Sequence, residues 1–520
     1  MRTSAAGVLC LILATQAVKA QQTDTTGGPL SAIDWLSQSV ATPTAAGTGA
    51  TAVTEPPVAE AGTAVPAGVT TSSLDAPSPD AVGLIRPAVS GLPRDLWGAG
   101  LTREIAQRLI AHPDDDLPAL RQLFLTLLLA EVEAPVDSGG RGELLQVRID
   151  KLMALGALEQ AAALIDAAGA TTPELFRRAF DVALLTGSED RACQNMANAP
   201  YLAPTVPARI FCLARSGDWE TAALTIRTSR ALGQITPDQE ALLSRFLDPD
   251  LYEGEPVPAA PDPVTPLDWM IYAAIGEPLP TESLPIAFSY AEIGPRSGWK
   301  ARIEAAERLT RAGTIPPNVI LGLYTDYDPA ASGGVWDRVA AFQAFDAAVT
   351  SGDPARIAAT LPEVWSRMQE AELEVPFATL FGKALVDLPL SGDAAAIAFR
   401  IGLLSPYAET VAKAYRPATA EDGFLVAIAM GTAAGALPPD SLARAISAAF
   451  RAPVPSVEAQ ALLDGNRKGE AIIAAIDGIG RGVQGDLRQV TEGLSLLRLT
   501  GLESVARRTA LELMILERRG

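Results

Sequence analysis

The chain has 520 residues and a formal net charge of −20, with 61 acidic side chains against 41 Lys and Arg. This acidic excess argues against binding to nucleic acid or to an anionic membrane surface, because both need clustered cations that release counterions. Beyond the N-terminus, no stretch reaches the roughly 18 uninterrupted apolar residues of a membrane-spanning helix, so we expect no insertion of the mature protein into a membrane.

Residues 1–20 have the pattern of a secretory signal peptide. Arg2 gives a positive start, residues 5–14 form a short apolar core, and small residues precede a cleavage position between Ala20 and Gln21. Arg carries most of the positive charge, and Ala and Pro are abundant, which is typical of a GC-rich bacterial genome. We therefore predict export through the Sec pathway to the periplasm of a Gram-negative bacterium.

Residues 21–90 are predicted to form a disordered tail. The segment is dominated by Ala, Thr, Pro, Gly and Val, and it contains too few large apolar side chains to offset the entropy cost of ordering. One short amphipathic island, PLSAIDWLSQSV at residues 29–40, interrupts it, with Ile33, Trp35 and Leu36 as the candidate docking side chains. The island either binds a partner protein, folds back onto the body of this chain, or has no role.

From residue 91 onward, the sequence predicts an all-α body. Apolar residues recur at three- and four-residue spacing in stretches that are followed by short turns rich in Gly and Pro. The clearest stretches are residues 101–112, 117–134, 143–156, 174–187, 441–450 and 504–517. Strand-like alternation is nearly missing, and the one ambiguous run, residues 318–327, is interpreted as a helix.

A proline-rich segment divides this body. Residues 249–266 hold six prolines, and proline cannot continue a helix because it lacks an amide hydrogen and its ring clashes with the preceding turn. We predict a linker there, between a first helical lobe at residues 91–248 and a second at residues 267–520. The expected fold class is an α-solenoid-like arrangement of helical hairpins in two lobes.

A weak internal repeat supports the helical hairpins. Two stretches, GALEQAAALIDAAG and GDWETAALTIRTSRALG, share a glycine, a bulky residue two places on, then Glu, an alanine and an aliphatic residue. These positions are Gly156, Leu158, Glu159, Ala161 and Ile165 in the first stretch and Gly217, Trp219, Glu220, Ala222 and Ile226 in the second. Looser copies begin at Gly352, Gly392 and Gly501.

This pattern resembles the junction between the two helices of a tetratricopeptide repeat. In that family a glycine closes the first helix, and a large residue with a small alanine lets the second helix pack closely. The resemblance covers half-repeats only, because Ile210 stands where the family has a first-helix glycine and no regular 34-residue period emerges. It implies a degenerate helical-repeat architecture, and the alternative is an irregular helical bundle with similar turns.

Cys193 and Cys212 are predicted to form a disulfide. Cys10 leaves with the signal peptide, and an even pair of cysteines in an oxidising compartment favours a bridge. The alternative is a pair of buried free thiols. A metal site is disfavoured, because the histidine lies far from both cysteines in sequence and two thiolates need further ligands.

His112 is the only histidine, so any Ser-His-Asp or Cys-His arrangement would depend on it. It lies just after an amphipathic helix, where a histidine suits the helix C-terminus through the helix dipole. The acidic run at residues 114–116 is interpreted as a solvated segment in which Asp116 caps the next helix, because it lacks the spaced oxygens and the glycine of a calcium loop. We therefore predict structural roles here, and no catalytic, metal-binding or cofactor-binding residue.

Two other patterns suggest chemistry but lack the necessary context. Residues 480–485, GRGVQG, satisfy Gly-x-Gly-x-x-Gly, but a dinucleotide site needs a preceding strand and most of an α/β domain after it. We interpret them as a flexible turn between helices. Glu503-Ser504 is similar to the catalytic Glu-Ser setting of soluble lytic transglycosylases, which also place a long α-superhelix in the periplasm. That resemblance implies a cell-wall-acting enzyme as the alternative function, although no catalytic domain surrounds the pair.

The leading hypothesis is a non-enzymatic periplasmic scaffold or adaptor that needs no cofactor. Acidic helical-repeat proteins bury one face of each helix pair and offer a concave surface to extended peptides or partner helices. The expected partner is another periplasmic or envelope protein, and the lack of strand-helix alternation disfavours a solute-binding protein. Five tryptophans are expected in the core rather than in a binding groove: Trp219, Trp269, Trp299, Trp336 and Trp365.

Overall fold

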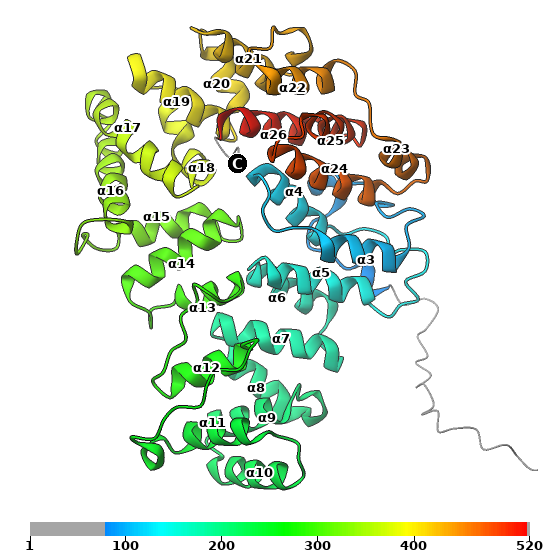
Figure 1. The fold of residues 1–520 in the computed structure, drawn as a ribbon, viewed down its shortest axis with the longest axis vertical. Coiled ribbons are helices and arrows are strands. Elements are labelled where there is room, and N and C mark those ends of the chain that lie inside the picture. Colours follow the sequence, from blue (N-terminus) through cyan, green and yellow to red (C-terminus); the bar gives the residue numbers. More distant parts are fainter. Residues whose placement is uncertain (1–77, 517–520) are drawn as a thin grey trace, which may run out of the picture. The chain divides into compact units, whose positions relative to one another are not determined.

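Helices make up the regular structure in the computed structural model, which describes residues 78–516 (Figure 1). Within these residues there is no β-strand, and the only extended pairing is an isolated bridge between Ile85 and Ala130. The predicted all-α fold class is therefore confirmed. Most of residues 318–327 lie in helix α15 (Pro317–Thr325), as predicted.

The helices follow one another with mostly short connections. The first group is η1 (Pro79–Ala81), α2 (Pro87–Ser90), α3 (Thr102–Ala111), α4 (Pro118–Leu129), α5 (Glu143–Ala154), α6 (Leu158–Ala168) and α7 (Pro173–Thr186). The second group is α8 (Glu189–Asn198), η2 (Pro200–Leu202), α9 (Val206–Arg215), α10 (Trp219–Ala231), α11 (Pro237–Leu247), η3 (Pro249–Tyr252) and α12 (Pro266–Ala274). The third group is η4 (Ile286–Phe288), α13 (Ser289–Glu292), α14 (Trp299–Arg311), α15, α16 (Val335–Ser351), α17 (Pro354–Glu370), α18 (Glu374–Val386) and α19 (Gly392–Leu404). The last group is α20 (Ala408–Ala414), α21 (Ala420–Ala429), η5 (Ala433–Gly435), α22 (Ser441–Arg451), α23 (Val457–Asp464), α24 (Lys468–Val483), α25 (Leu487–Leu499) and α26 (Glu503–Ile515).

Local sequence signals explain where many of these helices begin. A proline stands in the first two positions of α4, α7, α9, α11, α12, α15 and α17, where its missing amide hydrogen has no intrahelical partner to lose. At α11, Thr236 and Gln239 form a reciprocal capping box that satisfies two free amides. The helix starts are therefore largely encoded by nearby residues.

Glycine turns join successive helices into packed pairs. Gly156, Gly217 and Gly501 lie between α5 and α6, α9 and α10, and α25 and α26, with φ angles of 77°, 84° and 92°. Residues that carry a Cβ rarely adopt this backbone conformation, which explains why a glycine follows the first helix of each pair. These are glycines that the weak repeat identified, and the predicted body of packed helical pairs is confirmed.

The buried side chains form two hydrophobic cores. The larger core draws on α3–α7 and on the helices from α14 to α26, and the smaller core draws on α7–α12. Helix α7 contributes to both: Leu175, Val182 and Leu185 belong to the larger core, whereas Phe176 and Phe180 belong to the smaller one. All described residues belong to one compact unit. None of their helices combines the length and apolar character needed to cross a bilayer.

The cores divide the chain differently from the two lobes predicted on either side of residues 249–266. The smaller core includes α12, which follows the proline-rich segment and packs against α7 and α11, which precede it. The segment itself is tied to α11, because the guanidinium of Arg245 donates to the carbonyl oxygens of Tyr252 and Glu255 at 2.9 and 2.8 Å. The proline-rich segment separates α11 from α12, and the packing continues across it.

Residues 78–90, which were placed in the tail on composition, belong to the folded body. Asp80 is fully buried, and its carboxylate accepts a hydrogen bond from the amide of Leu145 at 2.7 Å. The buried guanidinium of Arg148 donates to the main-chain carbonyls of Asp80, Val82, Leu128 and Ala130. Burial raises the pKa of Asp80 and lowers the pKa of Arg148 to about 10, against their mutual attraction. Hydrogen bonds from Arg148 in α5 thus fix residues 80–82 to the body, although residues 78–90 contain few large apolar side chains of their own.

The first and last parts of the described chain pack against each other. Helix α24 contacts α3 and α4, and α26 contacts α4; Figure 1 shows α24 and α26 beside α4. The amide of Ala119, at the start of α4, donates to the buried carboxylate of Glu512 in α26 at 2.8 Å. Contacts between helices nearly 400 residues apart therefore complete the larger core.

Helices α24 and α25 approach closely because glycines line their interface. A Cβ added at Gly493 would lie 2.5 Å from Cγ1 of Ile479 and 2.9 Å from the carbonyl oxygen of Ala475. A Cβ added at Gly482 would lie 2.5 Å from Cγ2 of Val490. Such distances leave no room for a methyl group, so this contact depends on glycine.

Candidate functional site

A surface pocket opens between α8 and α9 beside the disulfide. The sulfur atoms of Cys193 and Cys212 are 2.00 Å apart, which confirms the predicted bridge between these two helices. Thr205 caps α9 by accepting a hydrogen bond from the amide of Ala208 at 3.1 Å. The cap fixes the start of α9, and the disulfide holds α9 against α8, so the pocket lies between two helices that are covalently linked.

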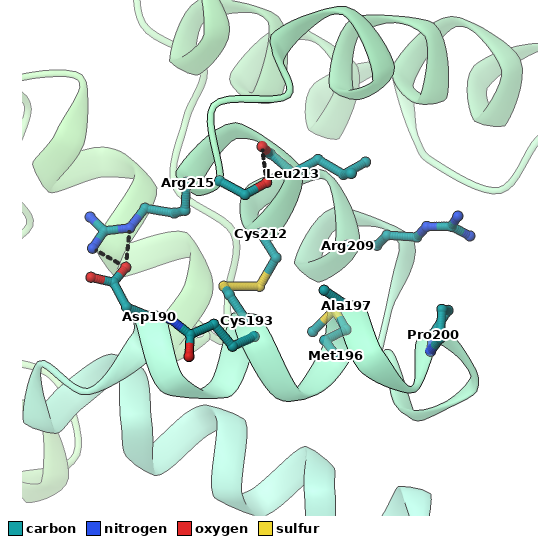
Figure 2. A pocket seen from close by; sticks show the side chains of 11 residues that line it. Asp190, Cys193, Met196, Ala197, Pro200, Arg209, Cys212, Leu213 and Arg215 are labelled. Atoms are coloured by element: carbon teal, nitrogen blue, oxygen red, sulfur yellow. Dashed lines mark hydrogen bonds and ion pairs between the residues drawn. A yellow bond between two sulfur atoms is a disulfide. The ribbon is translucent and has the colours of Figure 1, made fainter.

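The floor of the pocket is largely apolar. Its volume is about 510 Å³, within the range of sites that bind small ligands or single side chains of a partner. Figure 2 shows the disulfide at its centre. Helix α8 adds Met196 and Ala197 to the lining, and α9 adds Leu213. Since Met196 and both half-cystines are buried, a guest side chain would contact a surface that is already packed from behind.

The two arginines of the pocket differ in their environment. Arg215 donates to Asp190 at 2.6 Å and also lies 3.2 Å from the carboxylate of Glu189. Arg209 is exposed, and its guanidinium has no ion pair or hydrogen bond with any of the described residues. Figure 2 shows the Arg215–Asp190 pair at one end of the pocket and Arg209, with Pro200, at the other. The pocket therefore combines an apolar floor with one uncompensated cation at its rim.

Trp219, three residues after pocket-lining Ser216, is half exposed. In the weak repeat it occupies the same position as Leu158, which is fully buried, whereas Trp219 is 50% exposed. The core position predicted for Trp219 is therefore wrong. The other four tryptophans do pack against the larger core: Trp269, Trp299, Trp336 and Trp365. A large aromatic side chain that its repeat position would bury, but that remains exposed, is a candidate contact for a partner.

Exposed apolar side chains are frequent in the part of the sequence from the end of α8 to η3. Five of the sixteen large hydrophobic residues that are exposed in the described part of the chain lie between residues 201 and 251, a small fraction of its length. They are Tyr201, Trp219, Leu224, Leu232 and Leu251. None of the five lines the pocket, but their density in the chain segment that follows α8 favours an interaction surface on this part of the protein.

His112 lies in a different environment from the pocket. It follows α3, as predicted, and its side chain is buried between two carboxylates: Nε2 lies 2.7 Å from Asp116 and Nδ1 lies 2.6 Å from Asp477. Burial opposes protonation, but the hydrogen bonds and charges of the two carboxylates outweigh it and raise the pKa of His112 to about 9. A charged histidine between two acids, with the Phe124 ring tilted by 38° at a centroid distance of 4.0 Å, favours a structural ion cluster over a general base.

The acidic run after His112 differs from the solvated cap that was predicted. Asp116 is buried and pairs with His112, and the helix cap position before α4 is Leu117, which makes no side-chain cap. Asp114 accepts a hydrogen bond from Nζ of Lys151 at 2.7 Å. The difference arises because the buried imidazolium attracts the nearest carboxylate more strongly than a free helix amide does.

The two patterns that suggested enzymes lie within ordinary helices. Residues 480–483 continue α24, so the flexible turn predicted at 480–485 is limited to its last two residues. Glu503 is the first residue of α26 and accepts a hydrogen bond from Arg498 at 2.6 Å, in a half-buried ion pair. Within residues 78–516, no group of three His, Cys, Asp or Glu side chains is arranged to hold a metal ion.

Several predicted site residues lie outside the described part of the chain. These are the docking candidates Ile33, Trp35 and Leu36 and the cleavage residues Ala20 and Gln21. The docking segment and the signal peptide therefore stay predictions.

Sequence reasoning found the two cysteines but not the pocket that they line. The spacing of Cys193, Met196 and Ala197 places them near one face of a helix, which could have indicated a shared surface. Nothing in the sequence distinguishes Arg209 from the other arginines, because its lack of a partner depends on which acids the fold brings near.

Comparison of the chain with protein-family models, with curated proteins and with solved structures finds no match.

Proposed function

We propose that the protein is a non-enzymatic adaptor of the degenerate tetratricopeptide type, which binds an extended segment of another envelope protein in the α8–α9 pocket. The observation that carries the proposal is the pairing of an apolar, disulfide-backed floor with the exposed and unpaired guanidinium of Arg209. Extended segments of a partner typically bind helical-repeat proteins through a few anchoring side chains in such pockets.

The chemistry of the pocket defines the partner segment. A bulky apolar side chain would fill the volume over Cys193, Cys212 and Leu213, since burying a large apolar side chain contributes roughly 2 kcal/mol. A carboxylate beside it would pair with Arg209, and charge-assisted hydrogen bonds to arginine are stronger than neutral ones. We therefore propose a segment in which a large apolar residue lies next to Asp, Glu or a C-terminal carboxylate. Trp219, at the start of α10, offers further contact area.

The location proposed for this function is outside the cytoplasm. A disulfide persists in oxidising compartments and is rare where glutathione and thioredoxin keep thiols reduced. The signal-like sequence of residues 1–20 supports export, and the periplasm of a Gram-negative bacterium is the compartment that both features favour.

Selection from a displayed library of random peptides tests the proposal. The purified full-length chain should enrich peptides in which a bulky apolar residue adjoins an acidic one. Binding of an enriched peptide should fall about tenfold with Arg209→Gln, as expected for loss of one charge-assisted contact. Filling the pocket with Ala197→Trp should abolish it. Both residues are exposed, so neither change should alter the helical circular dichroism.

Arg227→Gln is the matched control. Arg227 is exposed on α10, makes no ion pair within the described part of the chain, and its replacement changes the net charge by the same amount. Peptides that bind equally well to the wild type and to both pocket variants would show that the interaction surface lies elsewhere. A selection that enriches no acidic-apolar motif would overturn the proposed chemistry of the partner.

A further inference from the structure

A smaller pocket lies on the other side of α8 from the α8–α9 pocket. This α6–α8 pocket has a volume of about 150 Å³, and side chains of α6, α7 and α8 line it. Its floor includes Ile165, Phe176 and Val182, all of which are buried. An apolar cavity of this size holds a group as large as benzene, so the α6–α8 pocket accommodates one aliphatic side chain.

The spacing of residues along α8 assigns the two pockets to opposite sides of the helix. Asp190, Gln194 and Ala197 line the α8–α9 pocket, whereas Arg191 and Asn195 line the α6–α8 pocket. Each set recurs at three- or four-residue spacing, which places its members on one side of a helix. All five residues are exposed, so an accessible ridge of α8 runs between the two pockets.

Amide side chains occupy this ridge. Gln194 and Asn195 are exposed neighbours, and neither side chain makes a hydrogen bond with any of the residues that the structure describes. An amide side chain offers both a donor and an acceptor, which are the groups that a peptide unit presents. The ridge can therefore bind the main chain of a crossing segment without regard to its sequence.

The rim of the α6–α8 pocket carries one charge of each sign. Arg191 and Asp166 are both exposed, and neither has an ion pair among residues 78–516. Opposite charges on one rim give no net preference for an anion or a cation, in contrast to the α8–α9 pocket with its single unpaired Arg209. The side chain that suits this second pocket is therefore neutral and aliphatic, such as Val or Leu.

The width of α8 determines how far apart two anchors must be. A helix with its side chains is about 10–12 Å across. An extended chain rises about 3.3 Å per residue and alternates its side chains between two faces, so anchors that point the same way are an even number of positions apart. Two positions span only about 7 Å, whereas four span about 13 Å and pass over the ridge.

We propose that the partner segment crosses α8 and is anchored on both sides of it. Its bulky apolar residue, with the acidic neighbour, would occupy the α8–α9 pocket, and a Val or Leu four positions away would occupy the α6–α8 pocket. Gln194 and Asn195 would bind the main chain between the two anchors. This inference rests on the function proposed for the α8–α9 pocket and adds a second anchor with a defined spacing.

Fluorescence anisotropy with the full-length chain and four labelled peptides, all flanked by Gly and Ser, tests the spacing. Trp-Asp-Gly-Ser-Val and Val-Ser-Gly-Asp-Trp carry both anchors at the correct spacing, one in each chain direction. Trp-Asp-Gly-Val-Ser shifts the second anchor by one position, and Trp-Asp-Gly-Ser-Ser lacks it. The better of the first two should bind about tenfold more tightly than the last two, as expected for burial of one aliphatic side chain.

The possible failures are distinguishable. Equal binding of all four peptides would leave the function of the α8–α9 pocket intact and refute the second anchor. If none of the four binds at about 1 mM, the chemistry proposed for the α8–α9 pocket is wrong, and the second anchor falls with it.

Three variants locate the second anchor. Ser188→Trp places a ring at the exposed rim of the α6–α8 pocket, and Ser188 makes no side-chain cap to α8. It should reduce the affinity of the correctly spaced peptide to that of the peptide without Val, whose own affinity should not change. Asn195→Ala should weaken the correctly spaced peptide about fivefold through loss of main-chain hydrogen bonds.

Asn198→Ala is the matched control, because Asn198 is an exposed amide on the same helix that lines neither pocket. It should leave binding of all four peptides unchanged, and thermal melts should show that all three variants remain folded. Unchanged affinity of the correctly spaced peptide for Ser188→Trp would overturn the second anchor. Equal loss with Asn195→Ala and Asn198→Ala would refute the main-chain contact on the ridge.

Discussion

The buried cluster of His112, Asp116 and Asp477 should make stability depend on pH in the alkaline range. The pKa of His112 is about 9 in the folded protein against about 6.5 in an unfolded chain. Because the folded-state pKa is the higher one, the stabilising contribution is fully present below pH 6.5 and is lost as the pH rises through 9. A difference of about 2.5 units corresponds to about 3 kcal/mol of unfolding free energy. The side chain is buried, so solvent screening reduces this figure little.

Urea titrations at a series of pH values from 6.5 to 9.5 would measure this contribution. Wild-type protein should lose about 3 kcal/mol across the window, relative to a His112→Gln variant that has no group to titrate there. Asp477→Asn removes one of the two carboxylate partners, so it should move the midpoint of the loss to lower pH. Other titrating groups affect the wild type and the variants alike, so the difference isolates the cluster. Equal pH dependence in the wild type and His112→Gln would refute the argument that the imidazolium is held by its two acids.

Two further predictions concern packing and the disulfide. Gly493→Ala should lower the unfolding free energy by about 1–3 kcal/mol, because the new methyl group meets the carbonyl of Ala475 in α24. The control is Gly322→Ala in α15, which should stabilise the protein slightly, because no atom lies within 4 Å of the added Cβ. Thermal melts of the two variants compare them directly, and equal melting temperatures would contradict the close contact of α24 and α25. Replacing Cys193 and Cys212 by Ser should cost about 3 kcal/mol in the chain-entropy model and should weaken peptide binding at the α8–α9 pocket. Urea titration measures the first effect, and unchanged peptide affinity would show that the bridge does not shape the pocket.

Features with local causes could be predicted from the sequence. The helix predicted at residues 318–327 is found there because its signals, the spacing of its apolar residues and the prolines before it, act within one or two turns. The glycine turns at Gly156 and Gly217 are correct for the same reason, since a left-handed residue is required where a helix ends and the chain reverses. The prediction that Cys193 pairs with Cys212 needed only the even number of cysteines after the signal peptide and the two short helices that carry them.

Features that depend on contacts between distant residues could not be predicted from the sequence. Nothing near His112 indicates Asp477, which is 365 residues away and turns a helix-end histidine into a buried ion cluster. Trp219 resembles Leu158 in its local pattern, and only the packing around each helix pair determines that one is exposed and the other buried. A cavity lined by α4, α18 and α26 has the same origin, because these helices meet only in the folded chain.

The contact between the two ends of the described chain has a consequence for biosynthesis. In an open helical-repeat array each unit contacts its neighbours, so folding can spread along the chain as it emerges. Here α4 needs α26, and Ala119 and Glu512 are 393 residues apart. At roughly 5–20 residues per second of synthesis, the apolar face of α4 waits about 20–80 s for its partner. During that interval the long-range contacts of the larger core are unmade, and the exposed apolar surface is prone to aggregation.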